Sequence, residues 1–460
     1  MTMQSRRDLY QAHRLMTRRA ALALLRGEPD VPDQPLRRLN VAAFSGILVA
    51  VIVTVLFFMW GLLGHSGSPL QNQPGTLFID KQTGQNYVFC DGGKLCPVLN
   101  YASARLALNP GASLNQQTVS PSAIAKFPQG PEIGIRGLPP LPDPSLLVRQ
   151  PWSICTQQVT TPVIGTHTVT ALSGGIQTGG QPLGTGALLV RALDQDQDWV
   201  IWDAQRMPIQ PAFIAALTNQ TPATVPVVWL NSLPQGPAFA PPTITGRGST
   251  VPGPDGIRVP VGKVYQASIA GTTQYYVMLQ RGLAQITQMQ AALLEVELGA
   301  PNPATLSPSQ VNSHLSAVKV PGDGLPANKP SVAAPAAAVP LCVVYSGGGS
   351  SLTRQVDTGG QLPKGGVTTD APGDVDQVAL PPERGALVAA APGTEPDSGV
   401  ISYFLVADGR RYALASTSVA GMLGYSLSQA VQLPAGVVQL IPQGPVLNPA
   451  AANDPVPSGG

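Results

Sequence analysis

Charged residues are scarce in this chain. Asp, Glu, Lys and Arg make up 11% of its 460 residues, whereas about a quarter is usual in soluble domains. Residues 1–40 include eight Arg against four acidic side chains, and the whole chain has a formal net charge of +2. The rest of the chain is therefore nearly neutral, which excludes the basic surface expected of a nucleic-acid-binding protein.

Histidine is equally rare, and no catalytic arrangement is recognisable. After Asn40 the chain has only His65, His167 and His314, and it contains no Gly-x-Ser-x-Gly elbow, so nucleophilic hydrolysis has no support. Glycoside hydrolysis needs two acids in one cleft. Candidates exist by number, but no pair stands out: Asp143, Glu295 and Glu383. We predict no catalytic residue and no cofactor.

A phosphate-binding loop is also missing. Such a loop needs GxxxxGK followed by Ser or Thr, because backbone amides surround the phosphates and the hydroxyl binds the metal. The nearest stretch runs from Gly256 to Val264, and it has the wrong spacing and Val where a hydroxyl is required. ATP hydrolysis is therefore not predicted.

Three alternating acids resemble the start of a calcium loop: Asp194, Asp196 and Asp198. A calcium loop also needs Gly at its sixth position and Glu at its twelfth, and this chain has Trp199 and Gln205 there. The pattern is better explained as a solvated acidic turn before a strand, and we predict no bound metal.

The chain has few cysteines, and all of them follow residue 64: Cys90, Cys96, Cys155 and Cys342. Three pairings are possible. Asp91-Gly92-Gly93 is a strong turn signal between the first two, so a local bridge is favoured, which leaves Cys155 with Cys342. A zinc site is the alternative, although no CxxC spacing or nearby His supports it.

What the chain does contain is one long apolar run, from Val41 to Gly64. No ionisable side chain occurs between Arg38 and His65, and a helix of this length rises about 1.5 Å per residue, enough to cross a hydrocarbon core of roughly 30 Å. The run begins too far from Met1 for a cleavable signal peptide. We predict an uncleaved, single-pass membrane helix.

Charge on the two flanks predicts the orientation. The eight Arg lie before the run, and no Lys or Arg follows it until Lys81. Because basic flanks remain in the cytoplasm, we predict a cytoplasmic N-terminus, with the bulk of the chain in the periplasm or on the cell-wall side. Disulfides persist there.

Residues 1–40 predict a basic amphipathic helix. Ser5 can cap it, apolar residues recur at helical spacing, and Gly27 can end it. Two interpretations remain open, a helix lying on the anionic inner leaflet and a docking helix for a cytoplasmic partner.

Within the apolar run, small residues recur every fourth position at Ala42, Gly46 and Ala50. Such a face permits close packing with another membrane helix. The same spacing also arises by chance in helices that contain Ala and Gly, so both interpretations remain open.

One short pattern recurs four times in the exported part. An aromatic residue begins a strand, a turn and a second strand follow, and an Ala-rich helical segment comes next; the aromatic residues are Tyr87, Trp199, Tyr276 and Tyr412. Apolar residues recur two positions later (Phe89, Ile201, Met278, Leu414) and ten or eleven positions later (Val98, Ile209, Ile286, Met422). Such ββα units must pack on one another or on a further domain, unless the alignment is fortuitous.

The stretches between the copies are rich in β-branched residues, Gly and Pro, and Gly and Pro together number 97. They predict a central β domain, and the fold class is α+β, mostly β. The predicted parts are 1–40 (basic helix), 41–64 (membrane helix), 75–125 (first repeat), 126–198 (central β domain), 199–222 (second repeat), 223–270 (central domain or connection), 271–300 (third repeat), 301–400 (central domain), 401–441 (fourth repeat) and 442–460 (flexible Pro-rich tail).

Specific strings give the chain a family resemblance. QSRRDLYQAHRLMTRRAALALLRGEPDVPDQPLRR, the anchor after it, and GTLFIDKQTGQNYVFCDGGKLCPVLNYASARLAL resemble EccB, a membrane component of the actinobacterial type VII (ESX) secretion system. The resemblance covers essentially the whole chain. Cys90 and Cys96 depart from it, since many relatives lack a cysteine pair in the first hairpin.

The resemblance implies an inner-membrane protein with four periplasmic repeats arranged pairwise about a central β domain, and a disulfide like Cys155–Cys342. It also implies assembly with EccC, EccD, EccE and a MycP-like protease in a hexameric complex. We therefore predict a structural subunit of an export machine, with a cell-wall (peptidoglycan) binding protein or a weak ATPase as the alternatives.

Overall fold

The computed structural model describes residues 6–27, 37–63, 73, 75–109, 114–193, 195–299, 302–322, 324–347, 352–369, 372–391 and 402–457. The chain forms two compact units, Met1–Gln71 and Asn72–Gly460. Of residues 65–75, which join the predicted membrane helix to the predicted first repeat, the structure describes 73 and 75.

The described part of the first unit consists of two helices, α1 (Arg6–Arg26) and α2 (Arg37–Leu63). Gly27, with a φ of 72°, follows α1 and donates its N–H to the carbonyl of Ala23, a common helix ending. Leu39–Gly61 within α2 is long and apolar enough to cross a membrane. The hydroxyl groups in this helix donate back to its own carbonyls, Ser45 to Val41 and Thr54 to Ala50, which satisfies them without water.

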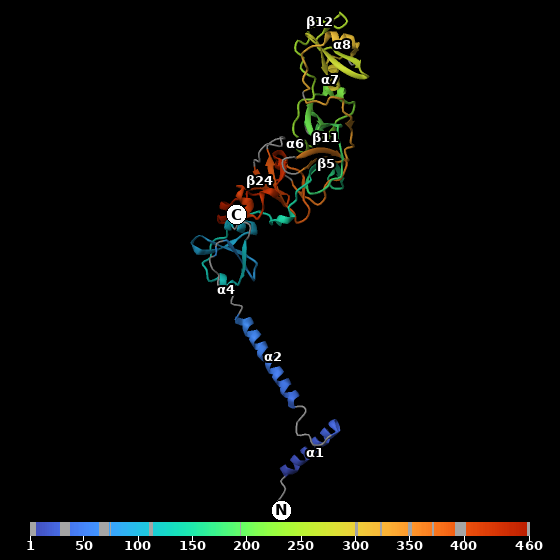
Figure 1. Ribbon diagram of the computed structural model, residues 1–460. Helices are drawn as coiled ribbons and strands as arrows, with labels where there is room; N and C mark the ends of the chain where they lie inside the picture. The colour runs from blue at the N-terminus through green and yellow to red at the C-terminus, as the bar shows by residue number, and fades with distance from the viewer. Residues whose placement is uncertain are drawn as a thin grey trace, which may run out of the picture. The chain divides into compact units, whose positions relative to one another are not determined.

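The second unit contains four sheets that share one topology (Figure 1). In each, three antiparallel strands are followed by a helical segment and a fourth strand that runs parallel to the first. The sheets contain β1 (Thr76–Asp80), β2 (Asn86–Cys90), β3 (Lys94–Val98) and β4 (Asn115–Val119); β8 (Ala187–Ala192), β9 (Asp198–Trp202), β10 (Gln205–Ile209) and β11 (Ala223–Val225); β14 (Val264–Ile269), β15 (Thr272–Leu279), β16 (Gly282–Ile286) and β17 (Ala304–Thr305); and β23 (Ala386–Ala391), β24 (Ser402–Ala407), β25 (Arg410–Ala413) and β26 (Val431–Pro434). We call these repeats one to four.

Two helical segments accompany each sheet. One lies between the third and fourth strands and one follows the fourth: α3 (Tyr101–Leu108) and α4 (Pro121–Ile124); η3 (Pro211–Phe213) with α5 (Ile214–Leu217), and α6 (Val227–Asn231); α7 (Gln288–Leu298) and α8 (Pro308–His314); α9 (Ser418–Met422) and α10 (Ala435–Gln439). Local sequence sets their limits. In α7, Thr287 and Gln290 form a capping box and Gly299 ends the helix in the left-handed region, as expected for these residues.

The structure corrects the predicted repeat in two respects. The predicted ββα unit omits the first and fourth strands that each repeat has in the structure. β8, β14 and β23 therefore belong to the repeats and not to the central domain. In the fourth copy the aromatic residue is also misaligned. Tyr87, Trp199 and Tyr276 lie on second strands, whereas Tyr412 lies on the third strand, β25, and the residue in the equivalent hairpin register is Phe404 on β24.

The repeats bury both faces of their sheets. Leu188 and Val190 of repeat two and Ala386 and Val388 of repeat four belong to the core of the central domain. On the opposite face, repeat two packs against α7 of repeat three through residues such as Met289. Repeat four packs against α3 of repeat one in the same way, through Leu106. The repeats therefore form two pairs, one with four and two with three, on either side of the central core.

The central domain is a seven-stranded sheet with the order β21-β22-β6-β5-β19-β20-β7. Its strands are β5 (Trp152–Thr161), β6 (Gly165–Gly174), β7 (Gln181–Pro182), β19 (Leu341–Ser346), β20 (Thr353–Thr358), β21 (Val367–Thr368) and β22 (Gln377–Ala379). Trp152, Tyr345 and Trp229 from α6 are its largest buried side chains. β18 (Val332–Ala333) pairs in parallel with β8 and adds a fifth strand to the sheet of repeat two. Elements outside these sheets are β12 (Thr250–Pro252), β13 (Arg258–Pro260), η1 (Asp91–Gly93), η2 (Pro144–Leu146), η4 (Leu427–Gln429) and α11 (Pro449–Asn453).

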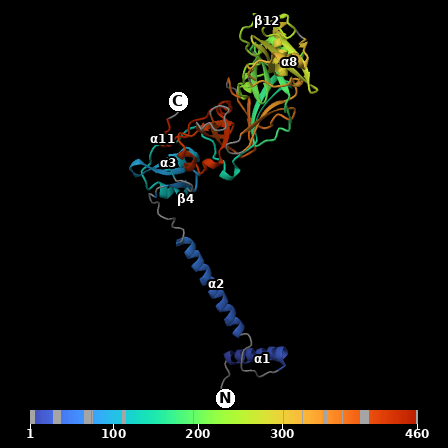
Figure 2. The same cartoon turned by 45° about the horizontal axis from the view of Figure 1, so that its top comes forward.

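The C-terminal segment differs from the predicted flexible tail at 442–460. Its described part contains α11, which lies beside α3 of repeat one (Figure 2). Leu447 and Ala452 are fully buried there, and the N–H of Val456 donates to the carbonyl of Glu132 at 2.8 Å. The apolar residues between the prolines thus have a neighbouring domain on which to pack, which composition alone did not indicate.

Candidate functional site

The residues considered for catalysis lie on different elements and loops of the second unit. Asp143 accepts hydrogen bonds from the N–H and hydroxyl of Ser145 at 2.8 and 2.6 Å, which lowers its pKa. Glu295 lies in α7, where burial raises its pKa, and Glu383 lies in the loop between β22 and β23. Among the described residues, no group of three or more His, Cys, Asp or Glu could hold a metal ion.

The sequence predicted that the alternating acids form a solvated turn, but this is only partly correct. Asp196 is exposed, but Asp198 is buried. Arg191 of the neighbouring strand donates to both oxygens of Asp198, at 2.7 and 2.8 Å. Asp198 therefore joins two strands of repeat two, and Asp194 lies outside the described residues.

The stretch from Gly256 to Val264 has no helix after it. Gly256 lies in the turn between β12 and β13, and Val264 begins β14. A phosphate-binding loop leads from a strand into a helix, whose N-terminal amides bind the phosphates. This stretch therefore lacks the local structure for nucleotide phosphate binding.

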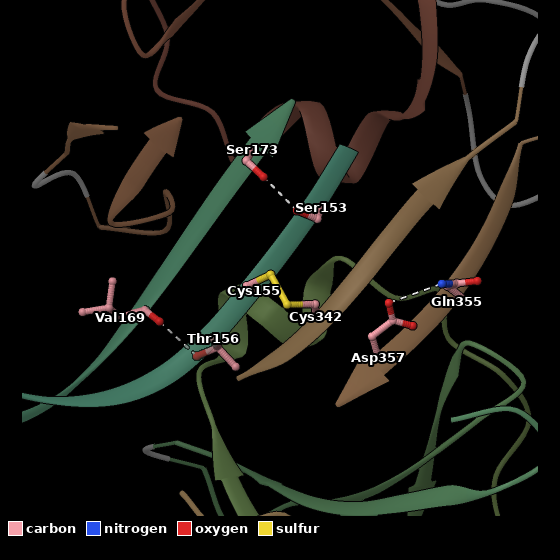
Figure 3. Close-up of a disulfide and its surroundings, with 8 residues drawn as sticks. All are labelled: Ser153, Cys155, Thr156, Val169, Ser173, Cys342, Gln355 and Asp357. Carbon is pink, nitrogen blue, oxygen red and sulfur yellow. Dashed lines mark hydrogen bonds between the residues drawn. A yellow bond between two sulfur atoms is a disulfide. The ribbon is translucent and has the colours of Figure 1, made fainter. Parts of the chain in front are cut away.

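A disulfide joins two neighbouring strands of the seven-stranded central sheet (Figure 3). Cys155 on β5 and Cys342 on β19 lie directly opposite each other, with Cα atoms 4.0 Å apart, and are bonded. Both are fully buried. The bond closes a segment of 187 residues that holds repeats two and three. A second disulfide joins Cys90 to Cys96 across the hairpin of repeat one.

A buried acid lies beside the central disulfide. Asp357 on β20 pairs in register with Cys342, and one of its oxygens accepts from the side chain of Gln355 at 3.3 Å (Figure 3). Its other oxygen, Oδ1, has no hydrogen-bond partner among the described residues. Burial raises the pKa of this carboxyl.

Contacts between repeats one and four hold the ends of the second unit together. Arg105 of α3 is almost fully buried, and its Nε donates to the carbonyl of Met422 at 2.8 Å. The hydroxyl of Tyr425 donates to the carbonyl of Pro142 at 2.8 Å, and burial raises the Tyr425 pKa. These polar groups are satisfied inside the interface, as buried polar groups must be.

A further repeated element, which we call the strap, was not predicted from the sequence. Pro-Gln-Gly-Pro occurs three times, at 128–131, 234–237 and 442–445. Each copy runs beside the third strand of its repeat, and the N–H groups of Leu95, Arg206 and Arg411 donate to the carbonyls of Pro128, Pro234 and Pro442 at 2.8–2.9 Å. The strap covers the edge of each sheet, and the recurring tetrapeptide is the signal that could have revealed it.

A full-length match identifies the family. The family described as "Type VII secretion system ESX-1, transport TM domain B" matches residues 3–456. The chain belongs to the EccB family. This confirms the predicted family, and the solved EccB chains confirm the α+β, mostly β class.

EccB proteins of several secretion systems are similar to this chain. "ESX-3 secretion system ATPase EccB3" of Mycolicibacterium smegmatis is 30% identical over 466 residues, which cover 95% of this chain and 88% of the relative. "ESX-5 secretion system ATPase EccB5" of Mycobacterium tuberculosis H37Rv is 27% identical over 481 residues, covering 97% and 93%. Both names include ATPase.

Solved EccB chains have the same fold. A chain in the intact ESX-5 inner membrane complex matches with a TM-score of 0.66 and 25% identity, covering 100% of this chain and 97% of that chain. A chain in the structure of the EccB3 dimer from the ESX-3 core complex matches with a TM-score of 0.66 and 26% identity, covering 82% and 99%. Both of these similar chains come from ESX complexes that contain several chains.

Proposed function

We propose that this chain is a structural membrane subunit of a type VII (ESX) secretion complex. The observation that carries the proposal is its similarity, over 100% of its length, to a chain of an intact ESX inner membrane complex. The two-unit organisation suits such a role, because a membrane helix links a basic helix to a disulfide-braced scaffold.

The expected orientation places α1 in the cytoplasm and the second unit in the periplasm. The basic residues before α2 support this arrangement. The two disulfides support it independently, because disulfides persist outside the cytoplasm. The periplasmic assembly of the ESX-5 complex contains a chain similar to 85% of this one.

The proposed partners are EccC, EccD, EccE and a MycP-like protease, within a hexameric complex that contains further copies of this chain. We further propose that Ala42, Gly46 and Ala50 form the face of α2 that packs on a neighbouring membrane helix. Close approach of two helix backbones needs small residues at such positions.

The test is the size and composition of the native complex. The full chain, extracted in mild detergent, should migrate in an assembly of megadalton size together with other membrane proteins. Migration as a small, free species would contradict the proposal. Phosphate release by the purified chain, compared with a mock purification, tests the ATPase name of its relatives, and we expect no release above the mock.

A further inference from the structure

The straps of three repeats make a second contact with the third strand. Four residues after the strap glutamine, the N–H groups of Ile133, Phe239 and Leu447 donate to the carbonyls of Pro97, Pro208 and Ala413 at 2.8–2.9 Å. The three donating residues are apolar and no more than 2% exposed. In repeats one, two and four the chain itself therefore fills the edge of the sheet.

Repeat three makes the first contact but lacks the second. The N–H of Ser316 donates to the carbonyl of Leu283 at 2.8 Å. The strap glycines make the same bond in the other repeats, where Gly130, Gly236 and Gly444 donate to Leu95, Arg206 and Arg411. Leu315 takes the place of the strap glutamine, because it bridges to Leu283 as Gln129, Gln235 and Gln443 bridge to the third strands of their repeats. Four residues after Leu315, however, the chain has Lys319, which is exposed. A lysine cannot be buried without a partner, and the segment turns toward α7, where Pro321 accepts from the side chain of Gln290.

Because the segment turns away, the backbone of Gln285 on the edge strand β16 is left open. Gln285 corresponds to Pro97, Pro208 and Ala413 in the other repeats, and its backbone faces the same side as that of Leu283, two residues before it. Gln285 is exposed, and within the described part of the chain no hydrogen bond reaches its backbone N–H or carbonyl. An edge of this kind can pair with another chain.

A groove lies over this edge, with a volume of about 880 Å³. Leu315 and Val318 on its wall are 54% and 57% exposed. Among the described residues that line it, Lys319 is the only charged one, and amide and hydroxyl side chains such as Gln285 and Thr287 line much of the remainder. The groove therefore suits an uncharged polypeptide segment with an apolar side chain, because the other three repeats bury an apolar residue at this position: Ile133, Phe239 and Leu447.

The β5–β6 hairpin has the properties of such a segment. β19 pairs with β5 only up to Thr156, and β22 pairs with β6 only at residues 171–173. Beyond these strands the hairpin ends in an uncharged turn, where Val163 is 93% and Ile164 is 70% exposed. Exposed, neighbouring branched residues at the end of a projecting hairpin are typical of a contact site.

We infer that the β5–β6 turn of a second copy of this chain docks in the groove of repeat three. Val163 and Ile164 then pack against Leu315 and Val318, and the free backbone beside the turn pairs with Gln285. This contact rests on the proposed function only in that the assembly contains several copies. It covers the exposed turn of one copy and the open edge of the other.

Cysteine crosslinking between two differently tagged copies tests the contact. The described cysteines are all in disulfides, so new thiols can be paired selectively. Full chains carrying Ile164→Cys and Gln285→Cys, mixed in detergent and mildly oxidised, should form a mixed disulfide. The matched control replaces Ile164→Cys by Ile257→Cys, because Ile257 lies in the β12–β13 turn and is 66% exposed. A yield no higher than that of the control overturns the inference.

A second pair of variants separates docking from folding. Ile164→Asp places a charge on the docking turn, and it should fold because Ile164 is 70% exposed there. It should lower the fraction of multi-copy species in mass photometry several-fold, whereas Ile257→Asp, in the β12–β13 turn at a residue 66% exposed, should not. Equal fractions for the two variants overturn the inference.

The outcomes also distinguish this contact from the proposed function. If the wild-type chain enters a large membrane complex but the Ile164–Gln285 pair does not exceed its control, the docking contact is wrong and the subunit role remains. If the pair crosslinks but the wild-type chain enters no complex, the contact remains and the subunit role is wrong.

Discussion

At the scale of single residues, Asp357 shows how the fold acts on one ionisable group. Its side chain is 5% exposed and lies next to the central disulfide. Burial disfavours the carboxylate, so the folded state holds the proton more tightly than the unfolded chain does. The resulting contribution to stability is present below the unfolded pKa and is lost as the pH rises through the raised folded pKa.

We therefore expect Asp357→Asn to raise the thermal unfolding temperature at neutral pH. The gain should shrink in acid, where wild-type Asp357 is protonated too. Asp143→Asn is the opposite control, because hydrogen bonds from Ser145 lower the pKa of Asp143. The Asp143 carboxylate stabilises the fold at neutral pH and this contribution is lost as the pH falls, so the variant should lower the unfolding temperature at neutral pH and less so in acid. Thermal unfolding followed by circular dichroism across this pH range measures both, and a constant gain for Asp357→Asn would contradict the explanation.

Residue-level predictions from sequence succeeded where the signal was local. The turn between Cys90 and Cys96 pointed to their pairing, and the structure has that bond. The ion pair of Asp198 could not be foreseen, because Arg191 lies on a strand whose alignment depends on the whole sheet. Tyr412 was misplaced because it is also an aromatic residue on a strand of the hairpin, although that strand lies after the turn and not before it.

At the scale of elements, the straps depend on glycine for close packing. A Cβ on Gly444 would lie 2.4 Å from a ring carbon of Tyr412, well inside van der Waals contact. The strap therefore lies against β25 only because residue 444 has no side chain.

Gly444→Ala should destabilise the second unit by about 1–3 kcal/mol, the usual effect of overpacking. Gly436→Ala is the matched control: Gly436 lies in α10, and its Cβ would meet only the carbonyl of Asn231 at 3.7 Å. The control should be neutral or stabilising by up to about 1 kcal/mol, because Ala favours helix. Denaturant unfolding of both variants gives the comparison, and equal stabilities would show that the strap tolerates the extra methyl group.

The membrane helix gives a second test at this scale. Gly46→Leu should reduce recovery of the native complex, because a bulky side chain would separate α2 from a packed neighbour. Val55→Leu lies on the opposite face of the helix and should leave recovery unchanged. Quantitative blotting of the complex on native gels measures both, and equal recovery for the two variants would mean that α2 serves only as an anchor.

Sequence periodicity predicted the hairpin and helix of the repeats but not their complete sheets. β4 is polar and largely exposed, and β17 contains two residues, so neither has an alternating pattern. The straps are irregular in structure, and only comparison of the three Pro-Gln-Gly-Pro copies with one another would have identified them.

At the scale of the whole molecule, the two disulfides should differ in how much they stabilise the folded chain. In the chain-entropy description, the Cys155–Cys342 bond across 187 residues contributes about 5 kcal/mol and the Cys90–Cys96 bond across 6 residues about 2 kcal/mol. Replacing both Cys155 and Cys342 by Ala should therefore lower the unfolding temperature more than replacing both Cys90 and Cys96. Calorimetry of both double variants decides, and a larger loss for the Cys90–Cys96 variant would reverse the ranking.

Family and fold class followed from the sequence because the chain retains specific strings and a clear membrane helix. The packing of repeat one on repeat four, and of α11 on α3, could not be predicted in this way. Such contacts join segments from opposite ends of the second unit's sequence, and their short apolar stretches between prolines resemble linkers when they are considered alone.

The Cys155–Cys342 bond also determines how the chain would carry tension. Force applied between the membrane helix and the C-terminus would pass through repeat one to β5, cross the sulfur bridge to β19, and continue to repeat four. Residues 156–341, which hold repeats two and three, lie outside this covalent path. An export machine could therefore strain its membrane anchor during substrate passage while the bridged segment stays mechanically unloaded.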